Sequence, residues 1–279
     1  MMRSLWSAAS GMIAQQTNLD TVANNLSNVN TAGYKKDTTE FKSLLYQTLQ
    51  SPSTNNVGDN KPVPAQVGLG TRVSSITTVF TQGNLQETTN TSYMAIEGSG
   101  FYKVRDFDGN ICYTRDGTFN FQPTEGGMML CSSQGYPVLD QNNNPIIVPS
   151  PARKDDVVVD QEGNIFVETG EKENRQRVPL VANGYEQKIG LVQFNNPAGL
   201  NNIGGNLYQE SVASGAPLEE STTAGIARSL IHQGYLEMSN VQVADEMVNM
   251  IVAQRAYEMN SKAIQASDEM LQQANNLRS

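Results

Sequence analysis

Heptad repeats of apolar residues at the two ends of the chain constrain its fold more than any other feature. Across residues 4–30 one set of positions recurs at alternating spacings of three and four, and seven of its eight members are apolar. This spacing places them on one face of a helix and is typical of a coiled-coil seam. Gly33 follows and suits the left-handed residue that ends a helix. The seam consists of Leu5, Ala8, Met12, Gln15, Leu19, Val22, Leu26 and Val29.

The C-terminal end carries a second helical seam, from about Asn240 onward. Its apolar column repeats every seven residues, and more apolar residues widen the same face. The companion column of Gln254, Ser261 and Asp268 is polar, so this seam is less regular than the first. Ser239 or Asn240 is the expected N-cap of this helix. The apolar column consists of Val243, Met250, Tyr257, Ile264 and Leu271.

The outer face of the N-terminal helix is almost free of charge. Between Ser4 and Tyr34 the only charged residue is Asp20, and the outward positions hold Ser, Thr, Asn, Gln and Ala. A solvated helix normally carries Lys and Glu there. Two helices alone are also marginally stable, because the entropy lost on ordering them rivals the gain from one seam. We therefore expect copies or partners to surround the terminal helices and order them on assembly; the alternative is a buried helix in an ordinary monomer.

Short segments rich in β-branched and aromatic residues fill the middle of the chain. Residues 106–111 and 160–165 read alike, and we interpret them as recurrent hairpin turns. Short strands with tight turns predict an antiparallel β domain over residues 71–216. The expected fold class is thus α+β: terminal helices (1–34 and 240–279) paired as a coiled coil, a central antiparallel β domain and an extended arm.

The regions 35–70 and 217–239 are expected to connect the helices to the β domain. Residues 50–70 are rich in proline, asparagine and glycine, which argues against a helix. At this length the segment is either a linker or an extended arm docked on another surface.

Composition excludes several classes of protein. With 19 Lys and Arg against 28 Asp and Glu the net charge is −9, which argues against a general nucleic-acid-binding protein. No apolar run approaches the roughly 18 residues that span a bilayer. The N-terminal residues lack the continuous apolar segment of a secretory signal, so we expect a cytoplasmic chain or one exported without a cleavable signal. The 28 Asn and 21 Gln slightly outnumber the 47 charged residues, so much of the surface is amide.

The sequence holds no recognisable catalytic or cofactor-binding motif. The single histidine, His232, has no catalytic or zinc-ligand partner at a usual spacing. Gly98 and Gly100 lack the third glycine of a dinucleotide fingerprint. Residues 106–110 lack the spaced ligands and terminal Glu of a calcium loop. We expect no enzyme activity, no cofactor and no metal.

Two acidic pairs and two cysteines complete the list of reactive side chains. The acidic pairs at 155–156 and 219–220 are interpreted as solvated. Cys112 and Cys131 either pair as a disulfide, if the mature protein lies outside the cytoplasm, or remain two semi-buried free thiols.

Several long stretches resemble one known family. Residues 23–36 read Ala-Asn-Asn-Leu-Ser-Asn-Val-Asn-Thr-Ala-Gly-Tyr-Lys-Lys, and residues 250–262 read Met-Ile-Val-Ala-Gln-Arg-Ala-Tyr-Glu-Met-Asn-Ser-Lys. With residues 95–101 and 113–119, they resemble the rod and hook family of bacterial flagellar axial proteins over nearly the whole chain. The signature positions are Asn24, Asn25, Asn28, Gly33, Gln254, Arg255, Tyr257 and Asn260.

The resemblance implies a structural subunit of a hollow shaft. Its helices would stack around a central channel, the β domain would pack outside them, and the arm would bridge subunits. Such a shaft carries torque from the motor to the hook. The self-assembly seam would comprise Leu5, Met12, Leu19, Val22, Leu26, Val29, Val243, Met250, Tyr257, Ile264 and Leu271.

The single β domain and the stretch 41–47, which runs into the Pro/Asn/Gly-rich segment, resemble members that build the distal rod. The implied partners are further copies in a helical homopolymer, proximal rod proteins, the hook protein, the surrounding P- and L-rings and the flagellar export apparatus. The implied location is the basal body, spanning the periplasm, after type III export without a cleavable signal. Phe41 and Leu45 resemble a hydrophobic export motif, with one apolar helix turn as the alternative.

Two other functions fit parts of the same sequence. A proximal rod or hook protein of the same family would carry the same termini. A β-rich surface-binding protein would need an acidic or aromatic cluster in a cleft, and the sequence shows no convincing one.

Overall fold

A computed structural model describes residues 2–50, 65–169, 176–182, 185–223 and 225–277. The expected α+β class is confirmed, with a helix near each end and a β-rich region between them. The chain divides into two compact units. A helical unit comprises residues 1–27, 37–78 and 242–279, and a β unit comprises residues 28–36 and 79–241.

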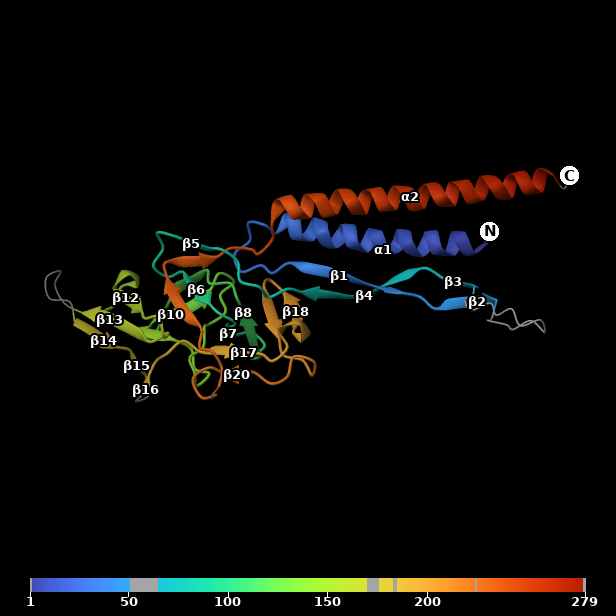
Figure 1. Ribbon diagram of the computed structural model, residues 1–279. Coiled ribbons are helices and arrows are strands. Elements are labelled where there is room, and N and C mark those ends of the chain that lie inside the picture. Colours follow the sequence, from blue (N-terminus) through green and yellow to red (C-terminus); the bar gives the residue numbers. More distant parts are fainter. Residues whose placement is uncertain (1, 51–64, 170–175, 183–184, 224, 278–279) are drawn as a thin grey trace. The chain divides into compact units, whose positions relative to one another are not determined.

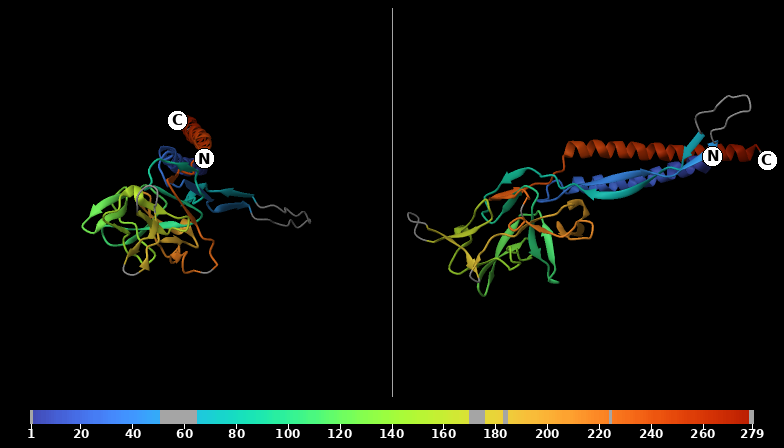
Figure 2. Two further views of the ribbon diagram at one scale, coloured as in Figure 1. Left: turned by 90° about the vertical axis from the view of Figure 1, so that its left-hand side faces the viewer. Right: turned by 60° about the horizontal axis from the view of Figure 1, so that its bottom comes forward.

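Two long helices lie side by side in the helical unit. Helices α1 (Met2–Ser27) and α2 (Val243–Asn276) contact each other and run in opposite directions (Figures 1 and 2). Periodic apolar positions form both helices, as the heptads predicted.

A two-stranded ribbon packs on α1 within the same unit. Strands β1 (Asp37–Ser43) and β4 (Thr71–Thr78) pair antiparallel, and both contact α1. Strands β2 (Tyr46–Gln50) and β3 (Ala65–Gly68) continue this pairing. Much of the proline-rich segment predicted within residues 50–70 lies outside the described residues.

The β unit contains short strands that pair antiparallel. Its largest sheet has the order β18-β19-β8-β7-β17-β20, beside three-stranded sheets β11-β10-β9 and β12-β13-β14 and the pairs β21-β6, β22-β5 and β15-β16. The strands are β5 (Leu85–Glu87), β6 (Met94–Glu97), β7 (Phe101–Arg105), β8 (Ile111–Thr114), β9 (Phe119–Thr124), β10 (Gly127–Ser132), β11 (Ile147–Pro149), β12 (Val157–Val159), β13 (Ile165–Thr169), β14 (Gln176–Pro179), β15 (Val181–Ala182), β16 (Tyr185–Glu186), β17 (Leu191–Gln193), β18 (Asn201–Gly204), β19 (Leu207–Gln209), β20 (Leu218–Glu219), β21 (Leu230–Gln233) and β22 (Tyr235–Glu237). Two short 3₁₀ helices, η1 (Lys154–Asp156) and η2 (Pro197–Gly199), connect some of them.

The two similar sequences in this unit are hairpin turns, as predicted. The first joins β7 to β8, where the Gly109 amide donates to the Asp106 carbonyl at 2.9 Å. The second joins β12 to β13, where the Gly163 amide donates to the Asp160 carbonyl at 2.8 Å. Both glycines have φ of +86°, which a residue with a Cβ adopts only under strain.

The largest sheet is apolar on both faces. Phe101 and Tyr102 are adjacent in β7, and their rings point to opposite faces, as the two-residue period of a strand requires. The Phe101 ring meets the Phe194 and Tyr208 rings edge to face, whereas Tyr102 packs on Phe119 in the larger core.

Both cysteines of this unit are buried free thiols. Cys112 lies in the larger core cluster, and Cys131 is fully buried on β10. Burial raises the pKa of both thiols, so they stay protonated and weakly nucleophilic. Of the two alternatives left by the sequence, the structure has the free thiols.

Helix α1 ends earlier than expected. Its last helical residue is Ser27, and a turn over residues 28–33 follows. Gly33 has the predicted left-handed conformation, with φ of +68°. It does not cap α1, however, because its amide donates to the Glu237 carbonyl at 2.8 Å within the β unit.

The predicted N-cap of α2 was wrong. The N-cap is Gln242, which makes no capping side-chain hydrogen bond. Asn240 instead accepts a hydrogen bond from the Lys36 amide and donates one to the Val79 carbonyl, both at 2.8 Å. Its side chain is therefore occupied by backbone groups of the β unit.

Candidate assembly surfaces

The contact between α1 and α2 is made by small and polar side chains. The Ser4 and Ser267 hydroxyls lie 3.4 Å apart, and a Cβ at Gly11 would lie 2.9 Å from the Asn260 amide nitrogen. The buried residues of α2 are Glu246, Ala253 and Ser267, and they share a seven-residue column with the half-buried Asn260. Small residues at this spacing let two helix backbones approach closely.

This contact column differs from the polar companion column that the sequence suggested. Gln254 and Asp268 are exposed and Ser261 is half-buried, whereas the buried column lies one residue earlier along the helix. Ala253 and Ser267 lie two heptads apart in the sequence, but Glu246 in the same column argues against a buried face, since charged residues are seldom buried.

The predicted seam residues flank this column, and their part in assembly stays a prediction. Leu5, Met12, Leu19, Leu26, Val29, Met250 and Ile264 are half-buried, Val22 is buried, and Val243, Tyr257 and Leu271 are exposed.

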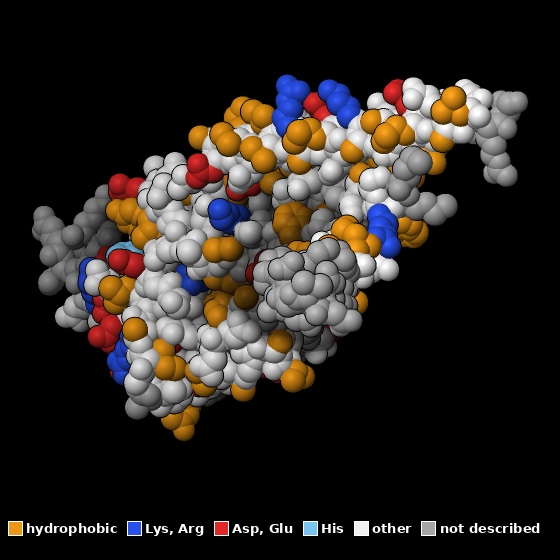
Figure 3. All heavy atoms as spheres, turned by 45° about the vertical axis from the view of Figure 1, so that its right-hand side comes forward, with side chains coloured by type: hydrophobic (Ala, Val, Ile, Leu, Met, Phe, Trp, Pro, Cys, Tyr) orange, Lys and Arg blue, Asp and Glu red, His pale blue; other side chains and the backbone are white. Residues whose placement is uncertain are grey.

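An apolar face of α2 is open to solvent. Val252 is 62% exposed and Met259 is 66% exposed, and apolar side chains gather along this helix in Figure 3. On α1, Trp6 and Ile13 lie one heptad apart and are also more than half exposed. A contiguous exposed apolar face marks an interaction surface. The face on α2 consists of Val243, Met247, Val248, Ile251, Val252, Met259 and Met270.

The ribbon exposes a second group of apolar side chains. Leu45 is 83% exposed, and Phe41, Tyr46 and Leu49 are also exposed. Phe41 lies in β1 next to a break in strand register at Glu40. The alternative of an apolar helix turn over residues 41–45 was therefore wrong, and the two predicted export residues are solvent-accessible.

The N-terminal signature contains one polar residue that joins three elements. Asn25 donates to the Asp37 carbonyl at 2.8 Å and accepts from the Asp37 amide at 2.9 Å. Its amide nitrogen also lies 3.4 Å from the Glu246 carboxylate. The side chain thus replaces a strand partner at the start of β1 while touching α2.

The remaining signature residues occupy varied positions. Arg255 makes a surface ion pair with Glu258 at 2.8 Å. Asn25 and Gly33 are buried, Asn28 and Asn260 are half-buried, and Asn24, Gln254, Arg255 and Tyr257 are exposed.

A buried ion cluster connects separate segments of the β unit. The Glu237 carboxylate accepts from Lys35, from Arg115 at 3.4 Å and from the Gly83 amide at 2.9 Å. Burial lowers the pKa of Lys35 and of Arg115, and the Glu237 charge opposes both shifts. No local sequence pattern indicates this cluster, because its members are far apart in the chain.

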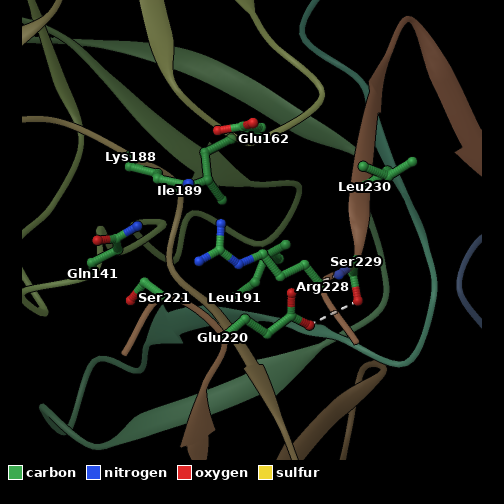
Figure 4. A pocket seen from close by; sticks show the side chains of 10 residues that line it. All are labelled: Gln141, Glu162, Lys188, Ile189, Leu191, Glu220, Ser221, Arg228, Ser229 and Leu230. Atoms are coloured by element: carbon green, nitrogen blue, oxygen red, sulfur yellow. Dashed lines mark hydrogen bonds between the residues drawn. The ribbon is translucent and has the colours of Figure 1, made fainter. Parts of the chain in front are cut away.

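A pocket of about 140 Å³ lies in the β unit (Figure 4). Glu220 forms one wall, 6% exposed, and accepts hydrogen bonds from the Ser229 amide and hydroxyl at 2.8 and 2.7 Å. The interpretation of Glu220 as solvated was wrong, because Gly98 and Gly100 leave the space that Ser229 and Glu220 fill. Arg228 lies in the middle of the pocket. The Gln193 side-chain amide donates a third hydrogen bond to the Glu220 carboxylate, at 2.7 Å.

The lone histidine has one acidic neighbour. His232 Nε2 lies 2.7 Å from a Glu97 carboxylate oxygen, and both side chains are partly exposed. Among the described residues, no three His, Cys, Asp or Glu side chains come together as a metal site.

No helix in the described part of the chain combines the length and apolar character needed to cross a membrane.

Three stretches of the chain match families of flagellar proteins. Residues 5–35 match the family described as "Flagella basal body rod protein", and residues 95–167 match "Flagellar hook protein FlgE/F/G D1 domain". Residues 232–277 match "Flagellar basal body rod FlgEFG protein C-terminal". The matches cover both helices and much of the β unit.

Whole proteins are similar over their full length. The "Flagellar basal-body rod protein FlgG" of Borreliella burgdorferi is 46% identical over 100% of this chain and 99% of that protein. The protein of the same name from Bacillus subtilis is 36% identical over 100% of both chains. The "Flagellar hook-basal body complex protein FlhP" of Bacillus subtilis is 32% identical, again over 100% of both. The chain therefore belongs to the structural proteins of the flagellar basal-body rod, the family that its terminal sequences resemble.

Proposed function

We propose that this chain polymerises with copies of itself into the hollow distal rod, which transmits torque from the motor to the hook, and that it is not an enzyme. The observation that carries the proposal is the exposed apolar face of α2. A face of this kind is unfavourable in water and becomes favourable when a second protein covers it. The full-length similarity to rod proteins named FlgG supports the same conclusion.

The terminal helices would form the inner layer of the rod in a coiled-coil arrangement. In each copy α1 and α2 already lie against each other. The predicted seam residues Val243, Tyr257 and Leu271 are more than a third exposed, so neighbouring copies can cover them. Assembly would then bury apolar surface that the single subunit leaves open.

The ribbon would act as the extended arm between subunits. Its exposed Phe41, Leu45, Tyr46 and Leu49 provide apolar contacts for a neighbouring copy. Phe41 and Leu45 would serve first as the signal for type III export, which requires an accessible segment.

The chain is a component of the flagellar basal body, as its family shows. Its partners there would be copies of itself, the proximal rod proteins below, the hook protein above and the P- and L-rings outside. The net charge of −9 argues against nucleic acid as a partner.

A pair of neighbouring substitutions tests the proposal. Val248→Asp places a charge on the apolar face, whereas Asn249→Asp places the same charge on the adjacent exposed residue. We expect Val248→Asp to abolish rod assembly and motility, with a change of no more than about 0.5 kcal/mol in the free energy of unfolding of the subunit. Asn249→Asp should leave both intact. Rods of normal yield from both variants would contradict the proposal.

A second function in the same family has some support. Residues 95–167 match a hook-protein domain, and a hook-basal body complex protein is 32% identical over the full chain. Gold labelling of a tagged chain in isolated hook-basal bodies separates the two. Label inside the rings indicates the rod, and label on the external hook indicates the second function.

A further inference from the structure

The column between α1 and α2 does not by itself select one alignment of the helices. Small and polar residues recur every seven positions on both helices. Sliding one helix by a heptad, about 10 Å, would bring similar residues together again. The column pairs Ser4, Gly11 and Asn25 of α1 with Ser267, Asn260 and Glu246 of α2. The same seven-residue spacing sets Asn18 opposite Ala253.

Asn25 breaks this repetition. It is 1% exposed, and Glu246 is 3% exposed, so their 3.4 Å contact lies in the interior of the helical unit. The two hydrogen bonds to Asp37 hold the Asn25 amide in place, with its nitrogen directed at both the Asp37 carbonyl and Glu246. A slip by one heptad that brings Ala274 opposite Ser4 would also set Ala253 opposite Asn25. The buried Glu246 carboxylate would then lose the Asn25 amide as a donor, which is costly.

We propose that Asn25, acting with Glu246, fixes the register of α2 on α1 and anchors the ribbon at the same point. Asn25 is therefore a positioning residue for the apolar face of α2. The register decides where Val248 and Val252 lie relative to Trp6 and Ile13. A single polar pair in an otherwise repetitive helix contact is an established means of selecting one register. All these contacts lie within one chain, so the inference does not depend on the rod.

Cysteine pairs report the register directly. Ser4→Cys with Ser267→Cys reports the observed register, because the two hydroxyls lie 3.4 Å apart. Ser4→Cys with Ala274→Cys reports a slip of one heptad. Disulfides are formed in the purified full-length chain and in isolated basal bodies. Peptide mass spectrometry identifies them and distinguishes any that involve Cys112 or Cys131.

We expect the in-register disulfide to dominate in the parent chain. Asn25→Ala and Glu246→Leu should each lower its ratio to the slipped disulfide by about tenfold. Glu246→Gln keeps an acceptor for the Asn25 amide and should retain the ratio. The matched control is Asn18→Ala, a half-buried residue one heptad earlier in the α1 column.

Three results would overturn the proposal. They are an unchanged ratio in Asn25→Ala and Glu246→Leu, an equal fall in Asn18→Ala, or loss of both disulfides in Asn25→Ala without any slipped product. Absence of the chain from basal bodies would contradict the proposed function instead, and the register would still be read in the purified chain.

Discussion

At the residue scale, the Glu237 carboxylate joins three segments of the β unit that are remote in sequence. It binds Lys35 of the N-terminal signature, Arg115 of β-unit residues 113–119 and the backbone at Gly83. A buried carboxylate is tolerated there because each oxygen has donors. Removing it would leave two buried cations without their counter-ion.

We expect Glu237→Gln to lower the free energy of unfolding by about 3–5 kcal/mol, the usual cost of breaking a buried ion pair. Urea denaturation of the purified chain measures the change. The control is Glu258→Gln, which removes the exposed partner of Arg255 and should change stability by less than about 0.5 kcal/mol. Equal effects of the two substitutions would show that the buried cluster contributes no more than a surface pair.

Asp116 predicts a pH dependence of stability. Burial raises its pKa above the ordinary 3.8, and hydrogen bonds from the Thr118 amide and hydroxyl only partly oppose this. The folded chain thus binds this proton more tightly than the unfolded chain. Stability from this group is full below pH 3.8 and is lost as pH rises through the folded pKa.

Asp116→Asn should therefore make the chain slightly more stable than the parent near neutral pH, because the amide oxygen still accepts from Thr118 without a buried charge. The advantage should shrink as the pH falls from about 7 to about 4.5. Urea unfolding of both chains at the two pH values measures it. A variant less stable than the parent at neutral pH would contradict the assignment.

At the scale of elements, the turn after α1 depends on a glycine for two reasons. Gly33 has φ of +68°, and a Cβ there would lie 2.6 Å from the Asp116 amide nitrogen. Gly109 in the β7–β8 turn also has a positive φ, of +86°, but its Cβ would meet nothing within 4 Å. Comparing substitutions at Gly33 and Gly109 therefore separates the cost of backbone strain from the cost of a steric clash.

Gly109→Ala should cost about 1–2 kcal/mol from backbone strain alone. Gly33→Ala should cost about 1–3 kcal/mol more, because the new methyl group must displace backbone atoms. Thermal or urea unfolding of the two variants measures the difference. Equal losses would mean that the chain relaxes around residue 33 without cost.

Helix α2 shows why sequence patterns located the helices but not their contacts. Its column of apolar residues correctly predicted a helix, yet the face against α1 is the small and polar column through Ala253 and Ser267. Hydrophobic periodicity assumes that the buried face is the most apolar one. That assumption does not hold here, because much of the apolar face is exposed.

At the scale of the whole molecule, the structures set by neighbouring residues were predictable from the sequence, and the contacts between distant segments were not. The hairpin turns at 106–110 and 160–164 and the two terminal helices follow from nearby residues. The Glu237 cluster and the burial of Glu220 depend on strands that are distant in sequence, so no local pattern reveals them. The same holds for Asn240, which suits an N-cap but binds Lys36 and Val79 instead.

On assembly into a rod, the terminal helices should gain stability from neighbouring copies. Amide hydrogen exchange, measured on the dilute subunit and on isolated rods, tests it most directly. Strands β6 to β8, which are buried in the β unit, serve as the internal control. We predict that α1 and α2, although paired in the subunit, exchange faster there than β6 to β8 and slow down in the rod, while β6 to β8 exchange slowly in both. Helices as slow as those strands in the dilute subunit, with no further slowing in the rod, would contradict the account.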